Sequence, residues 1–146
     1  MESVIPFQGT TLVSLGADCD EIEAKLGAPL SVRKSRQKEL REYSGERRVT
    51  YSSEGRAIEL GFSPPGRLVF EGHNLLEGDD PVATLMAYDE NPMRLFQFVV
   101  FLKIGIAIAG FHTGVESEKS IFVFAEGHWD KYVPDMTPFR ADDQKA

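Results

Sequence analysis

Two copies of the tripeptide Glu-Gly-His carry the residues with the clearest potential for chemistry. They are Glu71-Gly72-His73 and Glu126-Gly127-His128, and each ends a strand-like run. In an extended segment, residues two apart point to the same side, so each Glu could orient its own His. Two such pairs could supply an acid and a base, or ligands for zinc. The favoured interpretation is that each copy is an exposed turn, in which glycine permits the reversal.

The remaining residues give no sharper signal for catalysis. His112 lies in a polar loop, but three histidines without H-x-H or H-x-x-x-H spacing do not define a metal site. There is no glycine-rich phosphate loop and no G-x-S-x-G motif. Cys19 is the single cysteine, which fits a reducing compartment. We therefore predict no enzymatic activity, no cofactor and no metal. An enzyme or zinc protein that uses the two Glu-Gly-His segments stays open as an alternative.

The charge of the chain favours a protein partner over nucleic acid. The 146 residues carry a formal net charge of -7, which argues against nonspecific binding to phosphates. Acidic loops flank the second predicted helix and join two apolar strands, so they could oppose a cationic surface. Trp129 is either an interface anchor or a residue that closes the end of the core. The predicted partner-binding residues are Glu77, Asp79, Asp80, Asp89, Glu90, His112, Glu116, Glu118 and Trp129.

Nothing in the chain predicts a membrane segment. The first residues have no basic start and no long apolar stretch, so they do not form a signal peptide. The most apolar region, 98–111, contains Lys103 and several small residues and is too short to span a bilayer. We expect a cytoplasmic protein, monomeric or homodimeric, that binds neither membrane nor nucleic acid.

Capping signals predict two short helices. Asp18 followed by Glu21 is typical of a capping box, and Gly27 offers a left-handed stop. Asp80 is expected to cap the second helix, with Pro81 in its first turn. Helices this short depend on packing against a sheet.

Alternating and continuous apolar residues predict strands for most of the remaining chain. Strands that are apolar on both faces, which are common in the second half, must be covered on both faces. The expected strands are residues 11–15, 39–43, 47–52, 58–62, 68–70, 95–102, 104–109 and 121–125.

These elements predict a single α+β domain over residues 1–146, built from two pseudo-repeats. Each repeat is a short helix packed on antiparallel strands, with one continuous sheet as an open option. The first spans 10–75 and the second 79–130, and residues 134–146 are expected to form a flexible tail. Each unit reads as a helix, a strand, a strand ending in Gly-Phe and a strand ending in Glu-Gly-His.

Two segments resemble parts of known bacterial proteins. Residues 15–22, closing on Leu26-Gly27-Ala28-Pro29, resemble the helix that opens small tandem α/β binding modules. Residues 104–111 with 121–130 are similar to the strand pair of small immunity proteins encoded beside bacterial antagonism toxins.

The resemblance implies a non-catalytic inhibitor that covers the active site of a cognate toxin. The toxin would have a basic surface, and a nuclease is the best guess because nucleases hold phosphates. A small-molecule or peptide sensor with a cleft between the repeats is a further alternative.

Overall fold

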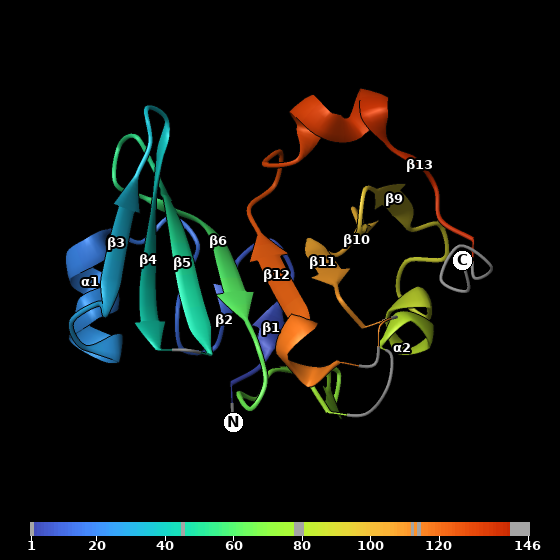
Figure 1. Cartoon of the computed structure of the whole chain (residues 1–146), viewed down its shortest axis with the longest axis horizontal. Coiled ribbons are helices and arrows are strands. Elements are labelled where there is room, and N and C mark those ends of the chain that lie inside the picture. Colours follow the sequence, from blue (N-terminus) through green and yellow to red (C-terminus); the bar gives the residue numbers. More distant parts are fainter. Residues whose placement is uncertain (1, 45, 78–80, 112, 114, 141–146) are drawn as a thin grey trace.

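A nine-stranded antiparallel sheet runs through both halves of the chain. Figure 1 shows the strands of the first half beside β12 of the second half. The computed structural model describes residues 2–44, 46–77, 81–111, 113 and 115–140. Within them the strand order is β13-β9-β10-β11-β12-β6-β5-β4-β3. The strands of the first half are β3 (Ser31–Lys34), β4 (Lys38–Ser44), β5 (Arg47–Ser52) and β6 (Ala57–Phe62). Those of the second half are β9 (Met93–Leu95), β10 (Phe98–Phe101), β11 (Ile106–Ala109), β12 (Ser120–Phe124) and β13 (Thr137–Pro138).

The two halves of this sheet join where β6 pairs with β12. The register places Phe62 opposite Ile121 and Leu60 opposite Val123, and all four side chains are buried. The structure therefore confirms a mixed fold that is mainly antiparallel sheet. It also shows that the two halves form one continuous sheet, which the sequence left open.

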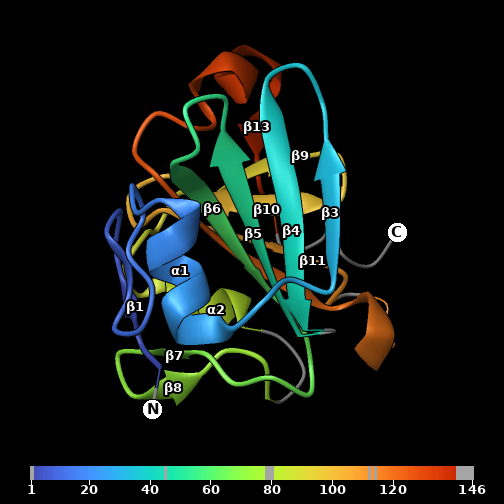
Figure 2. The ribbon, with the colours of Figure 1, turned by 90° about the vertical axis from the view of Figure 1, so that its left-hand side faces the viewer.

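The first helix forms where its capping signals predict it. In α1 (Cys19–Leu26) the Asp18 carboxylate accepts a hydrogen bond from the backbone N–H of Glu21 at 2.9 Å, and Gly27 ends the helix at φ 84°. Ile22 is buried in the main core, and Figure 2 shows α1 in front of the sheet face that it covers. The second helix, α2 (Val82–Met86), begins next to Pro81, and its expected cap at Asp80 lies outside the described residues.

The strand expected at residues 11–15 is wrong. The structure instead has a small hairpin of β1 (Val4–Ile5) and β2 (Gly9–Thr10), followed by a turn. The Thr10 hydroxyl accepts hydrogen bonds from the backbone N–H groups of Leu12 and Val13, and so diverts the chain from an extended path.

The strand expected at residues 95–102 is two strands. Leu95 ends β9 and pairs with Phe98 at the start of β10, so the chain reverses at Phe96 and Gln97. Phe96 takes a left-handed φ of 52° and is 79% exposed. The turn contains neither glycine nor proline, so the apolar pattern concealed it.

The pseudo-repeats are not confirmed in the form that the tripeptides predict. The first Glu-Gly-His lies in a hairpin of β7 (Val69–Phe70) and β8 (His73–Asn74), which is a separate two-stranded sheet. The second lies in a turn that follows β12 of the large sheet.

Residues 134–140, the first part of the expected flexible tail, contact the rest of the fold. Met136 is buried, β13 pairs with β9, and the Phe139 N–H donates to the Pro92 carbonyl at 3.0 Å. These contacts join a largely polar segment to the sheet. Residues 141–146 lie outside the described part of the chain.

Two buried clusters cover the second half of the sheet on both faces, as its apolar strands predict. The larger includes Ile106 and Ile108; the smaller includes Ala107, Phe124 and Trp129. Trp129 directly precedes the 3-10 segment η2 (Asp130–Asp135). In the described part of the chain, no helix has the length and hydrophobicity needed to cross a bilayer.

Candidate functional site

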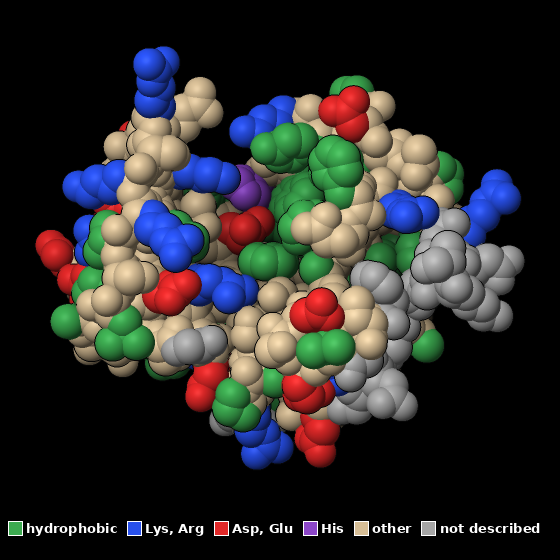
Figure 3. All heavy atoms as spheres, in the orientation of Figure 1, with side chains coloured by type: hydrophobic (Ala, Val, Ile, Leu, Met, Phe, Trp, Pro, Cys, Tyr) green, Lys and Arg blue, Asp and Glu red, His purple; other side chains and the backbone are tan. Residues whose placement is uncertain are grey.

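A cleft of about 770 Å³ opens between the tip of the β3–β4 hairpin and the η2 segment. Figure 3 shows this hollow in the space-filling view, with cationic side chains on one side and apolar ones on the other. The β6–β12 junction supplies Ile58, Glu59 and Phe122 to its lining. This volume falls in the range of small-molecule binding sites.

Aromatic rings form one wall of the cleft. Phe98 lies 5.8 Å from Phe122 and 5.4 Å from Trp129 between ring centroids, and Trp129 lies 5.8 Å from Tyr132. Their edge-to-face contacts hold the rings in fixed orientations. Phe96, which is largely exposed, also lines the cleft. An exposed aromatic side chain on a left-handed backbone is costly, which favours a binding role at this position.

Trp129 packs in the core, which is one of the two roles that the sequence left open, and its role as an interface anchor stays a prediction. Its side chain is buried in the smaller cluster, and it also lines the cleft. Its indole Nε1 is buried and has no hydrogen-bond partner among the described residues. A buried donor without a partner costs about 1–3 kcal/mol, so this wall is not optimised for stability alone.

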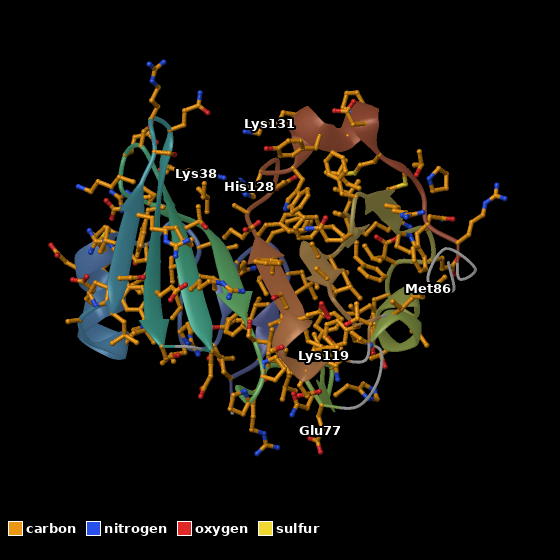
Figure 4. The ribbon with its side chains drawn as sticks, viewed as in Figure 1. Lys38, Glu77, Met86, Lys119, His128 and Lys131 are labelled. Carbon is orange, nitrogen blue, oxygen red and sulfur yellow. The ribbon has the colours of Figure 1, made fainter. Side chains whose placement is uncertain are left out.

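Cations stand at the mouth of the cleft on both sides. Arg36 and Lys38 come from the β3–β4 hairpin and Lys131 from η2, and all three are exposed. Figure 4 shows Lys38 and Lys131 on opposite sides, with His128 lying between them. This local positive charge contrasts with the net charge of the whole chain and attracts anions.

An imidazole–carboxylate pair lies deeper in the cleft. The Nε2 of His128 is 3.3 Å from Oε2 of Glu59, and the two side chains are 21% and 16% exposed. The expected partner within the tripeptide, Glu126, is exposed instead. The strand β6 supplies the carboxylate because the turn after β12 brings His128 back over the neighbouring strand.

The two Glu-Gly-His copies do not form a joint site. His73 lies in β8, at the opposite end of the molecule from η2 (Figures 1 and 2). Within the described residues, no group of three or more His, Cys, Asp and Glu side chains could hold a metal ion.

Asp89 does not present its charge to a partner. It is 2% exposed, and its carboxylate accepts hydrogen bonds from the backbone N–H groups of Asn91 at 3.0 Å and Lys103 at 3.1 Å. The carboxylate therefore links the α2–β9 connection to the β10–β11 turn, because buried backbone donors need partners. Glu90, the neighbouring predicted contact, is exposed.

A second hollow brings together two of the predicted acidic residues. Glu77 and Glu116 both line this hollow, whose volume is about 580 Å³. Glu116 pairs with the buried Lys119 ammonium, and Glu118 is exposed in the 3-10 segment η1 (Glu116–Glu118). Figure 4 shows Glu77 and Lys119 near the same end of the molecule. Asp79, Asp80 and His112 lie outside the described residues.

The cleft residues were not identified from the sequence, apart from Trp129. The sequence carries one signal for them, the basic segment 31–41, which contains Arg36 and Lys38. Loops are where binding surfaces diverge. Their partners across the cleft are far away in the chain, and only the folded sheet brings the two segments together.

Comparisons with protein-family models, with curated proteins and with solved structures gave no match.

Proposed function

We propose that the protein is a non-catalytic binding protein whose cleft takes a small organic anion with an aromatic or aliphatic body. The observation that supports this is an aromatic wall that faces a cationic hairpin tip across one cleft. The wall would remove the apolar body of the ligand from water, and Arg36, Lys38 and Lys131 would attract its charge. This corresponds to the sensor alternative rather than to the acidic surface predicted first.

Only weak affinity is expected. Burying about 150 Å² of apolar ligand surface contributes about 4 kcal/mol, and the exposed cations add about 1 kcal/mol at physiological salt. Association and side-chain ordering oppose these gains. A dissociation constant of about 1 mM or weaker follows for a simple ligand.

A titration with 3-phenylpropionate tests the proposal. Trp129 is the single tryptophan and lines the cleft, so its fluorescence reports occupancy directly. We expect a saturable change, and an affinity at least about fivefold higher than for the uncharged 3-phenylpropanamide. The ligand should be recovered unchanged, and its conversion would place the protein among enzymes.

Charge variants locate the site. Lys38→Glu and Lys131→Glu should each weaken 3-phenylpropionate binding severalfold. Arg33→Glu is the matched control, because Arg33 is exposed on β3 and does not line the cleft. Absence of saturation in the unmodified protein, or equal weakening by Arg33→Glu, would contradict the proposal.

A second candidate function is neutralisation of a toxin with a basic surface. It is supported by the hollow that Glu77 and Glu116 share, next to the exposed Glu118. On this proposal the acidic surface would cover the cationic active site of the toxin. The resemblance of residues 15–22 and 26–29 to bacterial binding modules, and of residues 104–111 with 121–130 to immunity proteins, favours the same function.

Charge reversal at Glu77 and Glu118 tests this second proposal. Glu116 is left intact, because it neutralises the buried Lys119 and its loss would also affect folding. The binding partner to assay is the product of the adjoining reading frame. Glu77→Lys with Glu118→Lys should weaken binding by tenfold or more, whereas Glu54→Lys, in the β5–β6 turn, should not. Unchanged binding would remove the acidic surface from consideration.

The origin of the two halves by duplication stays a proposal. It is supported by their order, since a short helix precedes a four-stranded antiparallel run in each half, β3–β6 and β9–β12. The last strands of the two runs pair with each other. Superposition of the α1–β6 and α2–β12 segments over their full length tests it.

A further inference from the structure

We propose that the ligand of the cleft carries a neutral hydrogen-bond donor at its buried end, directed at Glu59, and its anionic group at the mouth. This inference rests on the proposed function of the cleft and adds the chemical class of its ligand. That class is an amphipathic carboxylate whose apolar body ends in an O–H or N–H group.

Glu59 has acceptor capacity to spare. Its carboxylate lines the cleft, and within the described residues its only hydrogen-bond or ion-pair partner is His128. An ionised carboxylate has about four lone-pair positions and no donor, so one contact leaves most of them available. Because the group is only 16% exposed, a ligand that covers the cleft would remove its remaining water.

Such desolvation is costly unless the ligand replaces the lost hydrogen bonds. A purely apolar ligand end would therefore be penalised next to Glu59. A ligand with a donor at that position would instead gain a charge-assisted hydrogen bond, which is stronger than a bond between neutral groups.

The main-chain position of Glu59 is fixed by the sheet. On β6 it lies opposite Thr50 of β5 on one side and opposite Phe124 of β12 on the other. A strand paired on both sides cannot easily move its side chain away from an unfavourable ligand. The carboxylate is therefore a suitable element for discriminating between ligands.

The charges differ between the buried end and the mouth of the cleft, and this difference determines the orientation of the ligand. Glu59 and His128 are largely buried, whereas Arg36, Lys38 and Lys131 are exposed at the mouth. A ligand carboxylate at the buried end would meet the like charge of Glu59, while at the mouth it meets cations. A neutral donor suits the buried end better than an ammonium group, which would have to pass those cations.

Matched ligands test the inference by isothermal titration calorimetry. We compare 3-(4-hydroxyphenyl)propionate, 3-phenylpropionate and 3-(4-methoxyphenyl)propionate, which differ only at the end remote from the carboxylate. The phenol should bind at least about fivefold more tightly than the unsubstituted acid, because its O–H can donate to Glu59. The methoxy ligand has a similar size but no donor, so it should bind no better than the unsubstituted acid.

Variants at Glu59 assign the effect to this residue. Glu59→Leu removes the acceptor, so the preference for the phenol should fall to about one. Glu59→Gln keeps an uncharged acceptor and should give an intermediate ratio. Glu54→Gln, an exposed acid in the β5–β6 turn, should keep the full preference. Urea unfolding of each variant, followed by Trp129 fluorescence, shows whether the fold is retained.

The outcomes separate this inference from the proposed function. If 3-phenylpropionate binds but the phenol has no advantage, the donor inference is overturned and the binding function stands. If the advantage survives in Glu59→Leu, the role of Glu59 is overturned. If no ligand saturates the unmodified protein, the proposed function fails as well.

Discussion

Two tyrosine hydroxyls form the most buried polar contact between side chains of the first half. The oxygens of Tyr43 and Tyr51 lie 2.5 Å apart, and Tyr51 is fully buried. One hydroxyl must donate to the other, so removing either leaves its neighbour without this partner. A buried polar group that loses its partner costs more than the pair contributes.

Tyr51→Phe should therefore lower the free energy of unfolding by about 1–2 kcal/mol. The double variant Tyr43→Phe with Tyr51→Phe should lose less than the sum of the two single variants. Urea unfolding followed by Trp129 fluorescence measures all three. Strict additivity would show that the two hydroxyls do not interact in solution.

The same pair predicts a loss of stability at alkaline pH. Burial, followed by the contact with Tyr43, raises the pKa of Tyr51 above its usual range, and burial also raises the pKa of Tyr43. The folded state therefore holds these protons at a pH where the unfolded chain has released them. Stability is fully present below about pH 10 and falls as the pH rises above that value. Unfolding curves between pH 8 and 11 should show a smaller decline for the double phenylalanine variant, and an equal decline would contradict the assignment.

At the scale of single residues, the sequence predicted an interaction correctly where the two partners are close in the chain. The cap at Asp18 depends on a partner three residues away and was found. Asp89 looked like an exposed charge, because its second backbone partner, Lys103, lies 14 residues further along the chain. The pairing of His128 with Glu59 depends on strand order, which one sequence does not contain.

The connection between β11 and β12 depends on Gly110. Its φ is 80°, and a Cβ placed there would lie 1.8 Å from the carbonyl oxygen of Glu118. Gly72, in the β7–β8 hairpin, has a φ of 81° but has no atom within 4 Å of the same position. The two glycines share the backbone conformation and differ in the space available.

Gly72→Ala should cost about 1–2 kcal/mol, which is the strain of a left-handed alanine. Gly110→Ala carries the same strain and also forces the backbone of η1 away, so its cost should be larger by about 2 kcal/mol or more. Chemical denaturation of the two variants gives the comparison. Equal losses would mean that the η1 backbone moves away freely.

Elements were predictable where polar turns separate them clearly. The β4–β5 hairpin and β6 lie where alternation placed them. The reversal at Phe96 and Gln97 was missed because Leu95 and Phe98 on either side are apolar and the turn contains neither glycine nor proline. A strand was wrongly predicted at 11–15, because a threonine side chain, rather than a glycine or proline, ends the extended path.

At the scale of the whole molecule, the net charge of the chain differs in sign from the local charge at the mouth of the cleft. The chain is acidic overall, yet the cleft between the β3–β4 hairpin and η2 has a cationic mouth. The basic segment 31–41 supplies two of the cations, and the C-terminal turn supplies the third. Composition therefore gives the net charge of the chain but not the local charge at the cleft. The pairing of β6 with β12 places the segment 31–41 and η2 on opposite sides of the same cleft.

That pairing predicts that neither half folds alone. Separation between residues 77 and 78 would leave β6 and β12 as open edges, with Phe62, Leu60, Ile121 and Val123 exposed. The larger buried cluster draws side chains from both halves, so each fragment would lose most of its core. Exposed apolar edges favour aggregation over folding.

Fragments 1–77 and 78–146 should therefore each lack a cooperative thermal transition when measured separately by circular dichroism. Mixing them at equal concentration should restore part of the transition and the blue-shifted fluorescence of buried Trp129, because the edges of β6 and β12 are complementary to each other. A fragment pair mutated at Leu60→Asp should not recombine, whereas Glu54→Ala, outside the junction, should have no effect. Two fragments that unfold cooperatively on their own would show that the sheet is built from independent units, and would strengthen duplication as the origin of this fold.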